Sequence, residues 1–449
     1  IIMDRVISSH LHSWKKSHRS PLLIRGARQV GKSYSVEQFG KKEFENCIVL
    51  NFDFDPGYKS IFLTKDPNSI ISQLELLFRQ TITTDTLIFL DEIQECPDAI
   101  MSLRYFKELR PDIFVIGAGS LLEFAFTPDM RMPVGRVQFL NMFPLTFSEF
   151  MGALGEEKLI FHLNTVHISD IIPPAVHERL ISLLRSYFIL GGMPEVIYSY
   201  LESGSYLSAS RIQDALIETY KRDFYKYGKK SEVIHLQTVF SAIPRMVSEQ
   251  IKYVNIDRES KSRELKNALH LLSLARVITP VQGTDASGLP FGATLSDKQK
   301  YIFLDIGLMQ HLCGLNIEIM GPTDIMQINR GSLAEQFIGQ ELLALGDPFI
   351  SSELYFWARD KPGSSSEIDY CITRKGRIYP VEVKSGKTGT LRSLQRYMQE
   401  KNPPFAIRFW EGELSFHDKI LSIPLYMTSE TGRLIDEVYE MAGDNLDNT

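Results

Sequence analysis

A single eight-residue motif near the N-terminus limits the folds that this chain can adopt. Residues 26–33 read Gly-Ala-Arg-Gln-Val-Gly-Lys-Ser, the G-x-x-x-x-G-K-S pattern of a phosphate-binding P-loop. The motif directly follows the apolar run 21–24, so it lies where a buried strand would turn into a helix. Its glycines let backbone N–H groups converge on phosphate oxygens, and the next helix adds the positive end of its dipole. The sequence therefore predicts a nucleotide-binding α/β domain.

The residue types in this loop predict its contacts. We expect Lys32 to reach the β- and γ-phosphates of ATP or GTP, and the Ser33 hydroxyl to bind Mg²⁺. The predicted nucleotide-contacting residues are those of the motif and the one after it: Gly26, Ala27, Arg28, Gln29, Val30, Gly31, Lys32, Ser33 and Tyr34.

Further apolar segments have the length of strands and are separated by helical patterns. They are residues 47–52, 87–90, 113–116 and 137–140. Between the first two, apolar residues recur with helical spacing, namely Ile70, Leu74, Leu77 and Phe78. Strands that alternate with helices in this way favour a parallel sheet covered on both faces.

The segment 87–90 ends in Asp91-Glu92, which places two carboxylates where a strand emerges beside the phosphates. We expect Asp91 to hold the Mg²⁺ shell and Glu92 to polarise the water that attacks the γ-phosphate. A glutamate at the second position favours hydrolysis over passive nucleotide binding.

Two more residues are candidates for the same reaction, each with an alternative. Ser120 follows the segment 113–116 closely, where it is suited either to sensing the γ-phosphate or to capping the next helix. Arg136 is suited to neutralising transition-state charge, in its own site or in that of a neighbouring subunit. It is equally suited to lying on the surface where a strand starts. Both pairs of alternatives stay open at this point.

Residues 21–33, 90–94, 118–122 and 135–150 resemble a prokaryotic AAA-type P-loop ATPase family. Members of this family carry an AAA module followed by a C-terminal domain of unknown function with a nuclease-like fold. The resemblance covers essentially the whole chain and is most specific in its N-terminal part. It implies the AAA strand order with the P-loop strand central, and ATP rather than GTP as the nucleotide.

The resemblance also implies a small helical lid with a Gly-Gly-aromatic-Pro motif. The motif here reads Gly191-Gly192-Met193-Pro194, so methionine replaces the aromatic residue. The predicted fold is α/β, with a parallel AAA-type sheet. The predicted domains are a P-loop ATPase core at 1–155, a helical lid at 156–205, a winged-helix-like module at 206–315 and a PD-(D/E)xK nuclease-like domain at 316–449.

The predicted winged-helix module combines helices with a strand and a glycine-rich loop. Helical spacing after Ser262 is kept by Leu265, Ala268, Leu269 and Leu272. Residues 275–281 are typical of a short strand, and residues 283–292 of a loop. This pattern fits a winged helix, which the resemblance also implies. Residues 300–308 resemble a strand-Asp-x-Gly-Leu hinge of the family, which we interpret as structural.

Basic residues in this module suggest a surface that contacts nucleic-acid phosphates. They are Lys252, Arg258, Lys261, Arg263, Lys266 and Arg276. Acidic residues are interleaved with them, so an ordinary solvated surface of mixed charge is the favoured interpretation.

The C-terminal part contains a second group of charged residues. Its predicted strands are 354–357, 367–370 and 378–384, and Glu335 lies on an amphipathic helix before them. Glu382 and Lys384 share one face of their strand because side chains alternate. A hairpin would bring Asp369, on the preceding strand, beside Glu382.

This arrangement and the resemblance together indicate a PD-(D/E)xK nuclease site. Phosphodiester hydrolysis needs a divalent ion, and carboxylate oxygens suit Mg²⁺ or Mn²⁺. We expect Asp369 and Glu382 to be ligands, with Glu335 binding directly or through water. Lys384 would orient or deprotonate the attacking water. Cleavage itself stays open, because this fold also serves as a non-catalytic platform.

Composition sets wider limits. A net charge of −6 over 449 residues gives no global basic field, so any DNA-binding surface must be local. The 4 cysteines have no paired spacing, which argues against zinc or disulfides and favours a reducing compartment. No apolar run of about 18 residues and no signal peptide is visible, so we expect a cytoplasmic protein outside the membrane.

The preferred hypothesis is an ATP-hydrolysing AAA-type protein whose nuclease-like domain acts on DNA or binds it. The alternative is an ATP-dependent signalling switch or scaffold with a catalytically inactive C-terminal recognition domain. A homo-oligomer is required if Arg136 acts in trans.

Overall fold

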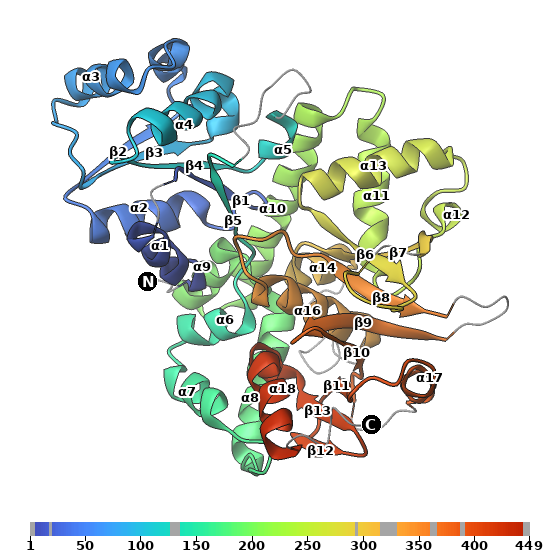
Figure 1. Ribbon diagram of the computed structural model, residues 1–449. Coiled ribbons are helices and arrows are strands. Elements are labelled where there is room, and N and C mark those ends of the chain that lie inside the picture. The colour runs from blue at the N-terminus through green and yellow to red at the C-terminus, as the bar shows by residue number, and fades with distance from the viewer. Residues whose placement is uncertain are drawn as a thin grey trace.

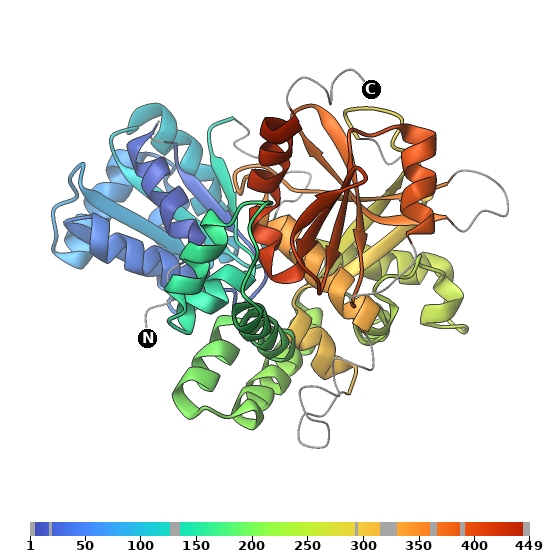
Figure 2. The same ribbon diagram turned by 90° about the horizontal axis from the view of Figure 1, so that it is seen from below.

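The computed structural model describes residues 5–17, 20–125, 135–291, 295–314, 330–359, 366–386 and 391–442. Within these residues, the strands form one five-stranded and one eight-stranded sheet. Figure 1 shows the first sheet and its helices in blue and cyan, and the second in yellow to red. The view from below shows these two parts side by side, with green helices adjoining both (Figure 2).

The N-terminal sheet is parallel and has the order β2-β3-β4-β1-β5. Its strands are β1 (Leu22–Arg25), β2 (Asn46–Asn51), β3 (Thr86–Asp91), β4 (Phe114–Gly119) and β5 (Gln138–Asn141). The segments predicted as strands are thus confirmed, with slightly shifted ends. β1 pairs with β4 on one side and β5 on the other, so the strand that leads into the P-loop is internal. All side chains of β3 and β4 are buried, because helices cover both faces.

The two faces of this sheet belong to two separate cores. Leu22 and Ile24 pack with Trp14 and Phe39 on one face, whereas Leu23 points to the other. This division follows from the alternation of side chains along a strand. The first face is covered by α1 (Val6–Lys16) and α2 (Lys32–Glu43). The second is covered by η1 (Pro56–Leu63), α3 (Pro67–Phe78), η2 (Ile93–Glu95) and α4 (Pro97–Leu109).

Helix α3 buries a different stripe from the predicted one. Ile70 and Leu74 are buried as expected, but Leu77 is 54% exposed and Ile71 is buried in its place. Apolar residues occur on more than one side of this helix. Periodicity alone therefore could not select the face that meets the core.

The short helix α5 (Leu122–Ala125) lies between β4 and β5, and a run of helices follows the first sheet. They are α6 (Phe147–Ala153), α7 (Glu157–Thr165), α8 (Pro174–Leu190), α9 (Pro194–Ser203), α10 (Tyr206–Tyr227), α11 (Val233–Met246), α12 (Tyr253–Ile256) and α13 (Ser262–Leu274). The stripe predicted for α13 is confirmed, because all four of its apolar residues are buried. Among the described helices, none is by itself long and apolar enough to cross a membrane. In the described part of the chain, α8 and α9 are the only helix pair that reaches that length and composition together, and they are bent by 117°.

The eight-stranded sheet has the order β12-β13-β11-β10-β9-β8-β6-β7. Its strands are β6 (Ile278–Thr284), β7 (Leu295–Phe303), β8 (Leu354–Ala358), β9 (Glu367–Arg374), β10 (Arg377–Val383), β11 (Ala406–Trp410), β12 (Ser415–His417) and β13 (Ile420–Pro424). The helices of this part are α14 (Ile306–Leu312), α16 (Arg330–Leu345), α17 (Arg392–Lys401), η3 (Leu425–Glu430) and α18 (Thr431–Ala442). The three predicted C-terminal strands correspond to β8, β9 and β10.

The hairpin β6–β7 does not stand apart as a wing. β6 pairs in parallel with β8, so strands from both sides of residue 315 share one sheet. Pairing with β8 satisfies backbone groups that an isolated hairpin edge would leave exposed. β6 also begins later than the predicted strand and continues to Thr284, into the predicted loop. The boundaries of the four predicted domains remain a proposal.

The segment 300–308, interpreted as a structural hinge, joins β7 to α14 and contacts the Gly-Gly motif. The buried carboxylate of Asp305 accepts hydrogen bonds from the backbone N–H of Gly192 at 2.6 Å and of Leu308 at 3.0 Å. Gly191 has φ +74°, and a Cβ there would collide with the Asp305 carboxylate. Glycine is therefore required where the Gly-Gly motif meets this segment.

Helix α16 connects the second sheet to α8 and to the beginning of α6. The Gln340 amide donates to the Tyr187 hydroxyl of α8 at 2.8 Å, and the Phe147 N–H donates to Glu341 at 2.9 Å. A hydrophobic core continues from α1 and the first sheet to α18. The two sheets are therefore joined by packed side chains rather than by a linker alone.

Candidate nucleotide site and C-terminal acidic cluster

The P-loop has the backbone that its sequence requires. β1 ends at Arg25, and α2 begins at Lys32. Gly31 lies in the left-handed region with φ +95°, and a Cβ at Gly26 would collide with the backbone oxygen of Met142. Both motif glycines are thus needed to form the loop.

The Lys32 side chain is folded back onto this loop. Its Nζ donates to the backbone oxygens of Gly26 at 3.0 Å and Ala27 at 2.7 Å. Burial lowers the pKa of Lys32 to about 8, while the nearby carboxylates of Glu92 and Asp91 act in the opposite direction. The ammonium group is therefore held where phosphate oxygens would replace the two carbonyls.

Ser33 and Asp91 meet at the same edge of the sheet. The Ser33 hydroxyl donates to Asp91 Oδ1 at 2.8 Å, and the Asn51 amide donates to Oδ2 at 2.9 Å. Burial raises the pKa of Asp91, and the hydrogen bond from Ser33 opposes this shift. Asn51 was not predicted. The sequence pointed to it only through its position near the end of the segment 47–52. In the parallel sheet Asn51 pairs with Asp91.

A hydrogen bond from Gln94 orients the Glu92 side chain. Glu92 has φ +48°, and the Gln94 amide donates to its Oε2 at 2.5 Å. Ser120 is 5% exposed, and its hydroxyl makes no hydrogen bond to any described residue. It therefore does not cap α5, and its alternative as a phosphate-sensing residue stays a prediction.

Arg136 does not join these residues within one chain. It precedes β5, whose first residue, Gln138, donates a backbone hydrogen bond to Pro21 just before β1. This end of the two strands lies at the edge of the sheet opposite the P-loop. The Arg136 side chain is 49% exposed and pairs with Glu108 of α4 at 3.0 Å. A role at its own P-loop is therefore excluded by its place in the sheet. A role in a neighbouring subunit remains a prediction.

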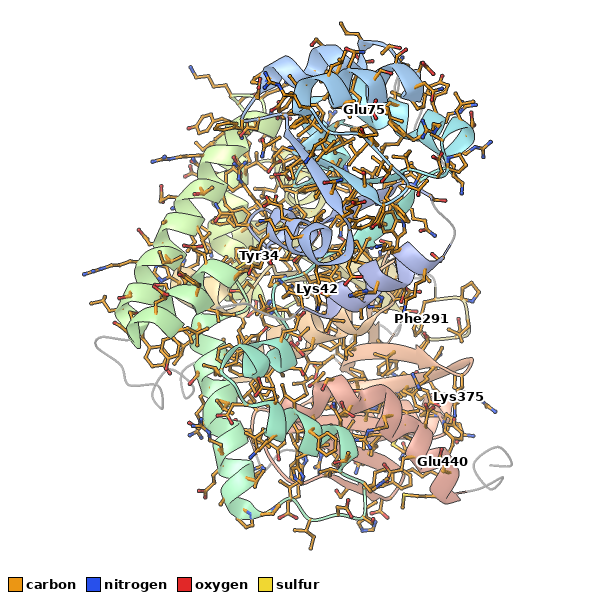
Figure 3. All side chains as sticks on the ribbon, turned by 90° about the vertical axis from the view of Figure 1, so that its left-hand side faces the viewer. Tyr34, Lys42, Glu75, Phe291, Lys375 and Glu440 are labelled. Atoms are coloured by element: carbon orange, nitrogen blue, oxygen red, sulfur yellow. The ribbon has the colours of Figure 1, made fainter. Side chains whose placement is uncertain are left out.

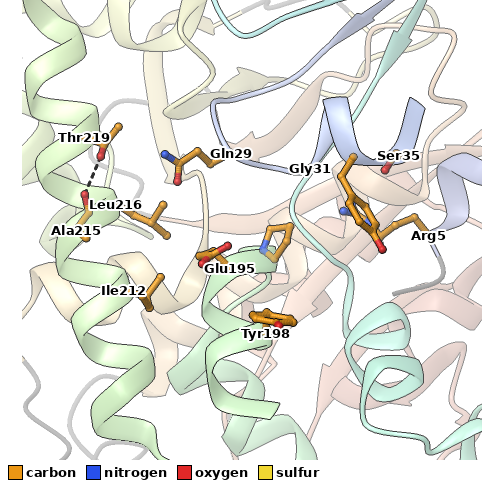
Figure 4. A pocket seen from close by; sticks show the side chains of 12 residues that line it. Arg5, Gln29, Gly31, Ser35, Glu195, Tyr198, Ile212, Ala215, Leu216 and Thr219 are labelled. Atoms are coloured by element: carbon orange, nitrogen blue, oxygen red, sulfur yellow. Dashed lines mark hydrogen bonds between the residues drawn. The ribbon is translucent and has the colours of Figure 1, made fainter. Parts of the chain in front are cut away.

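A cavity of about 730 Å³ adjoins the P-loop (Figure 4). α2 contributes Tyr34, α9 contributes Pro194 and Tyr198, and α10 contributes Ile212 and Leu216. Tyr34 faces the green helices in the side view (Figure 3). Pro194 of the predicted lid motif thus reaches the nucleotide site.

Residues from outside the P-loop also form hydrogen bonds and an ion pair with it. Arg5 donates to the backbone oxygen of Val30 at 3.0 Å, and the Tyr220 hydroxyl donates to that of Arg28 at 2.5 Å. The Arg28 side chain pairs with Asp223 of α10 at 3.0 Å. Arg5, Tyr220 and Asp223 carry no local signal of this role in the sequence, because the contacts form only through long-range packing.

The predicted C-terminal residues also come together. β9 and β10 form an antiparallel hairpin in which Val381 is opposite Tyr370, so the next pair is Glu382 and Asp369. Asp369 accepts a hydrogen bond from the Val383 N–H at 2.7 Å. Lys384 pairs with Glu382 at 2.6 Å, as their shared strand face predicts.

Two residues that sequence analysis did not assign to this site, Lys300 and Glu367, lie in the same cluster. Lys300 of β7 contacts Glu367, and its Nζ lies 3.8 Å from Glu335. Although burial opposes its charge, the carboxylates of Glu335 and Glu367 raise the pKa of Lys300. The sequence could have pointed to Glu367, because it lies two residues before Asp369 and so shares its face of the strand. Lys300 is brought in only because β7 belongs to the same sheet.

The acidic residues are strongly perturbed by this environment. Burial and the charge of Asp369 raise the pKa of Glu335 well above its usual value. The same two causes raise the pKa of Glu382 to about 7. Over the described part of the chain, no group of three or more His, Cys, Asp or Glu side chains is arranged to hold a metal ion. The metal-ligand roles of Glu335, Asp369 and Glu382 stay predictions.

Three family models match separate segments of the chain. An AAA domain matches residues 18–151, and two domains of unknown function, DUF8612 and DUF4143, match residues 181–318 and 330–426. No curated protein matches this sequence.

Several solved structures are similar at low identity. The Walker-type ATPase PABY2304 of Pyrococcus abyssi is 15% identical over 70% of this chain and 96% of its own, with a TM-score of 0.46. The signal transduction ATPase PH0952 of Pyrococcus horikoshii is 12% identical over 77% and 46%, with a TM-score of 0.27. Cdc6p of Pyrobaculum aerophilum is 12% identical over 62% and 86%, with a TM-score of 0.23.

The AAA match covers the P-loop, the Asp91-Glu92 strand and all five strands of the parallel sheet. The chain therefore contains an AAA-type P-loop ATPase domain in its N-terminal part.

Proposed function

We propose that this chain binds Mg-ATP at the P-loop and hydrolyses it. The observation that carries this proposal is the 2.8 Å hydrogen bond between Ser33 and Asp91, beside the buried ammonium group of Lys32. The hydroxyl and carboxylate oxygens are the donors that Mg²⁺ prefers, so these two residues fit the ion. When bound, Mg²⁺ would neutralise charge on the phosphates.

The remaining residues have separate tasks in this proposal. Lys32 leaves the carbonyls of Gly26 and Ala27 to contact the β- and γ-phosphates. Glu92 accepts a proton from the attacking water, and Gln94 positions its carboxylate. The tyrosine rings of Tyr34 and Tyr198 supply apolar walls for the adenine base in the 730 Å³ cavity.

Calorimetry and phosphate release test this function directly. The intact chain should bind Mg-ATP, and Lys32→Ala should lose most of that affinity. Gln73→Ala on the outer face of α3 is a matched control and should bind as the parent does. A wild-type chain that fails to bind Mg-ATP would disprove the proposal.

We further propose that ATP hydrolysis controls a DNA-directed activity of the C-terminal cluster. Support comes from helix α16, which carries Glu335 in the cluster and Gln340 and Glu341 against the ATPase part. A change of α16 relative to α8 would therefore alter both sites together. Turnover of ATP with and without DNA, and DNA cleavage with Mg²⁺ or Mn²⁺, are the measurements that test this coupling.

One observation favours the second candidate function, in which the C-terminal domain recognises a partner without cleaving it. The ammonium group of Lys300 already lies among Glu335 and Glu367, where it compensates carboxylate charge without a metal. In that case DNA binding persists in EDTA and no product forms with either ion. Metal-dependent cleavage by the wild type, lost in Asp369→Asn, would exclude it.

A further inference from the structure

Arg276 occupies a backbone position that usually takes glycine. It follows the last turn of α13 with φ +58°, and its N–H donates to the Ser273 oxygen at 3.0 Å. The next N–H, of Val277, donates to the Leu272 oxygen at 3.0 Å. This is the pattern of a helix C-terminus closed by a left-handed residue, where a Cβ costs about 1 kcal/mol. An arginine at this position therefore makes the helix end less stable than glycine would.

The Arg276 side chain leaves its own helix and reaches the ATPase part. Its Nη2 donates to Glu123 Oε1 at 3.2 Å. Glu123 belongs to α5, the short helix that follows β4 and Ser120. The same oxygen lies 3.6 Å from Nη1 of Arg25, the residue before Gly26 of the P-loop. One carboxylate is therefore shared by two guanidinium groups at the phosphate edge of the sheet.

The surroundings favour an anion beside Arg276. Three positively charged side chains lie at this edge, those of Lys32, Arg25 and Arg276. The pKa of Lys32 is lowered mainly by burial, and the charge of Arg276 lowers it further. Arg28 is separately paired with Asp223. Arg136, the arginine that sequence analysis considered for this role, lies at the opposite edge.

We propose that Arg276 is the arginine that this chain supplies in cis to the γ-phosphate of bound ATP, and that Glu123 holds it when no nucleotide is bound. This inference rests on the proposed function of the P-loop. Arg276 leads directly into β6, which pairs with β7, the strand that carries Lys300. The γ-phosphate would thereby gain a contact to the sheet that holds the C-terminal cluster.

The sharpest test replaces Arg276 with glycine, because glycine suits the left-handed backbone and should leave the fold at least as stable. We expect Arg276→Gly to lower kcat at least about 100-fold, since an arginine on the γ-phosphate contributes strongly to turnover. Affinity for ATP should fall about tenfold or more, whereas affinity for ADP should change less than about twofold. Calorimetry with each nucleotide and steady-state phosphate release measure these changes.

Arg79 offers a matched control. It also ends a helix, with φ +53°, but it is exposed at the end of α3. Arg79→Gly should behave as the parent chain in both assays.

The possible outcomes separate the two proposals. If the wild type neither binds nor hydrolyses ATP, the proposed function of the P-loop fails. If the wild type is active and Arg276→Gly keeps its kcat and its preference for ATP over ADP, this inference alone is overturned. Equal loss of ATP and ADP binding together with a lower melting temperature would assign Arg276 a structural role and also overturn it.

Discussion

The Gln94 amide donates a hydrogen bond of 2.5 Å to the Glu92 carboxylate. A Cβ at position 119 would collide with the Gln94 side chain, so this arrangement requires Gly119. Gly119 ends β4, the strand next to β3, which Glu92 directly follows. Neighbouring strand ends thus set the orientation of the residue proposed to activate water.

Replacing Glu92 with glutamine should abolish turnover while leaving nucleotide binding intact. Glutamine keeps the shape of the side chain but cannot accept the proton, so kcat should fall about 100-fold or more. Phosphate release measures the rate, and calorimetry verifies that Mg-ATP still binds. Gln94→Ala should lower kcat less, because Gln94 only positions Glu92. Undiminished turnover in Glu92→Gln would remove Glu92 from its role.

Replacing Gly191 with alanine should destabilise the contact between the Gly-Gly motif and the segment 300–308. The new Cβ would collide with Asp305, and the positive φ adds further strain. We expect a loss of about 2–4 kcal/mol in the free energy of unfolding. Chemical denaturation measures this loss. Gly204→Ala is the control for positive φ without a collision, since its Cβ would meet open space. Equal losses in both variants would contradict the role given to Asp305.

Asp305 should also make stability depend on pH. Burial raises the pKa of Asp305 from 3.8 to about 6, so the folded chain keeps a proton that the unfolded chain releases. The contribution of Asp305 is therefore fully present below about pH 4 and is lost as the pH rises to about 6, by roughly 3 kcal/mol.

Comparison of wild type with Asp305→Asn between pH 4 and pH 7 isolates this effect, because other groups titrate equally in both. The difference between their free energies of unfolding should change by that amount in favour of the variant as the pH rises. A difference that is constant with pH would show that Asp305 does not titrate in this range.

The C-terminal cluster should lose any metal-dependent cleavage when Lys384 or Asp369 is changed. Lys384→Ala removes the ammonium group beside Glu382, and Asp369→Asn removes a carboxylate, so each should reduce cleavage at least about 100-fold. ATP turnover without DNA should stay as in the parent, because neither residue contacts the P-loop. A Lys384→Ala protein that cuts DNA at the parental rate would place the activity elsewhere.

Arg136 should matter only between chains. If it reaches the P-loop of a neighbour, Arg136→Ala should reduce turnover, and the rate per chain of the wild type should rise with protein concentration. Light scattering with and without ATP reports the assembly. A fully monomeric wild type with undiminished activity would leave Arg136 as a surface residue paired with Glu108.

The sequence by itself determined the features that depend on local spacing. The P-loop, the strand ending in Asp91-Glu92 and the hairpin that joins Asp369 to Glu382 each involve residues whose relative positions follow from a turn or a strand period. The helix at 262–274 was equally predictable, because Leu265, Ala268, Leu269 and Leu272 recur with helical spacing and form the buried face.

Only the tertiary structure decided the features that depend on packing between distant segments. It placed Arg136 away from the P-loop and Arg276 beside Glu123, and it joined β6 to β8 so that Lys300 enters the acidic cluster. No periodicity encodes these contacts. They form because a buried face or an open sheet edge must be covered, and the segment that covers it is chosen by the fit of the whole core.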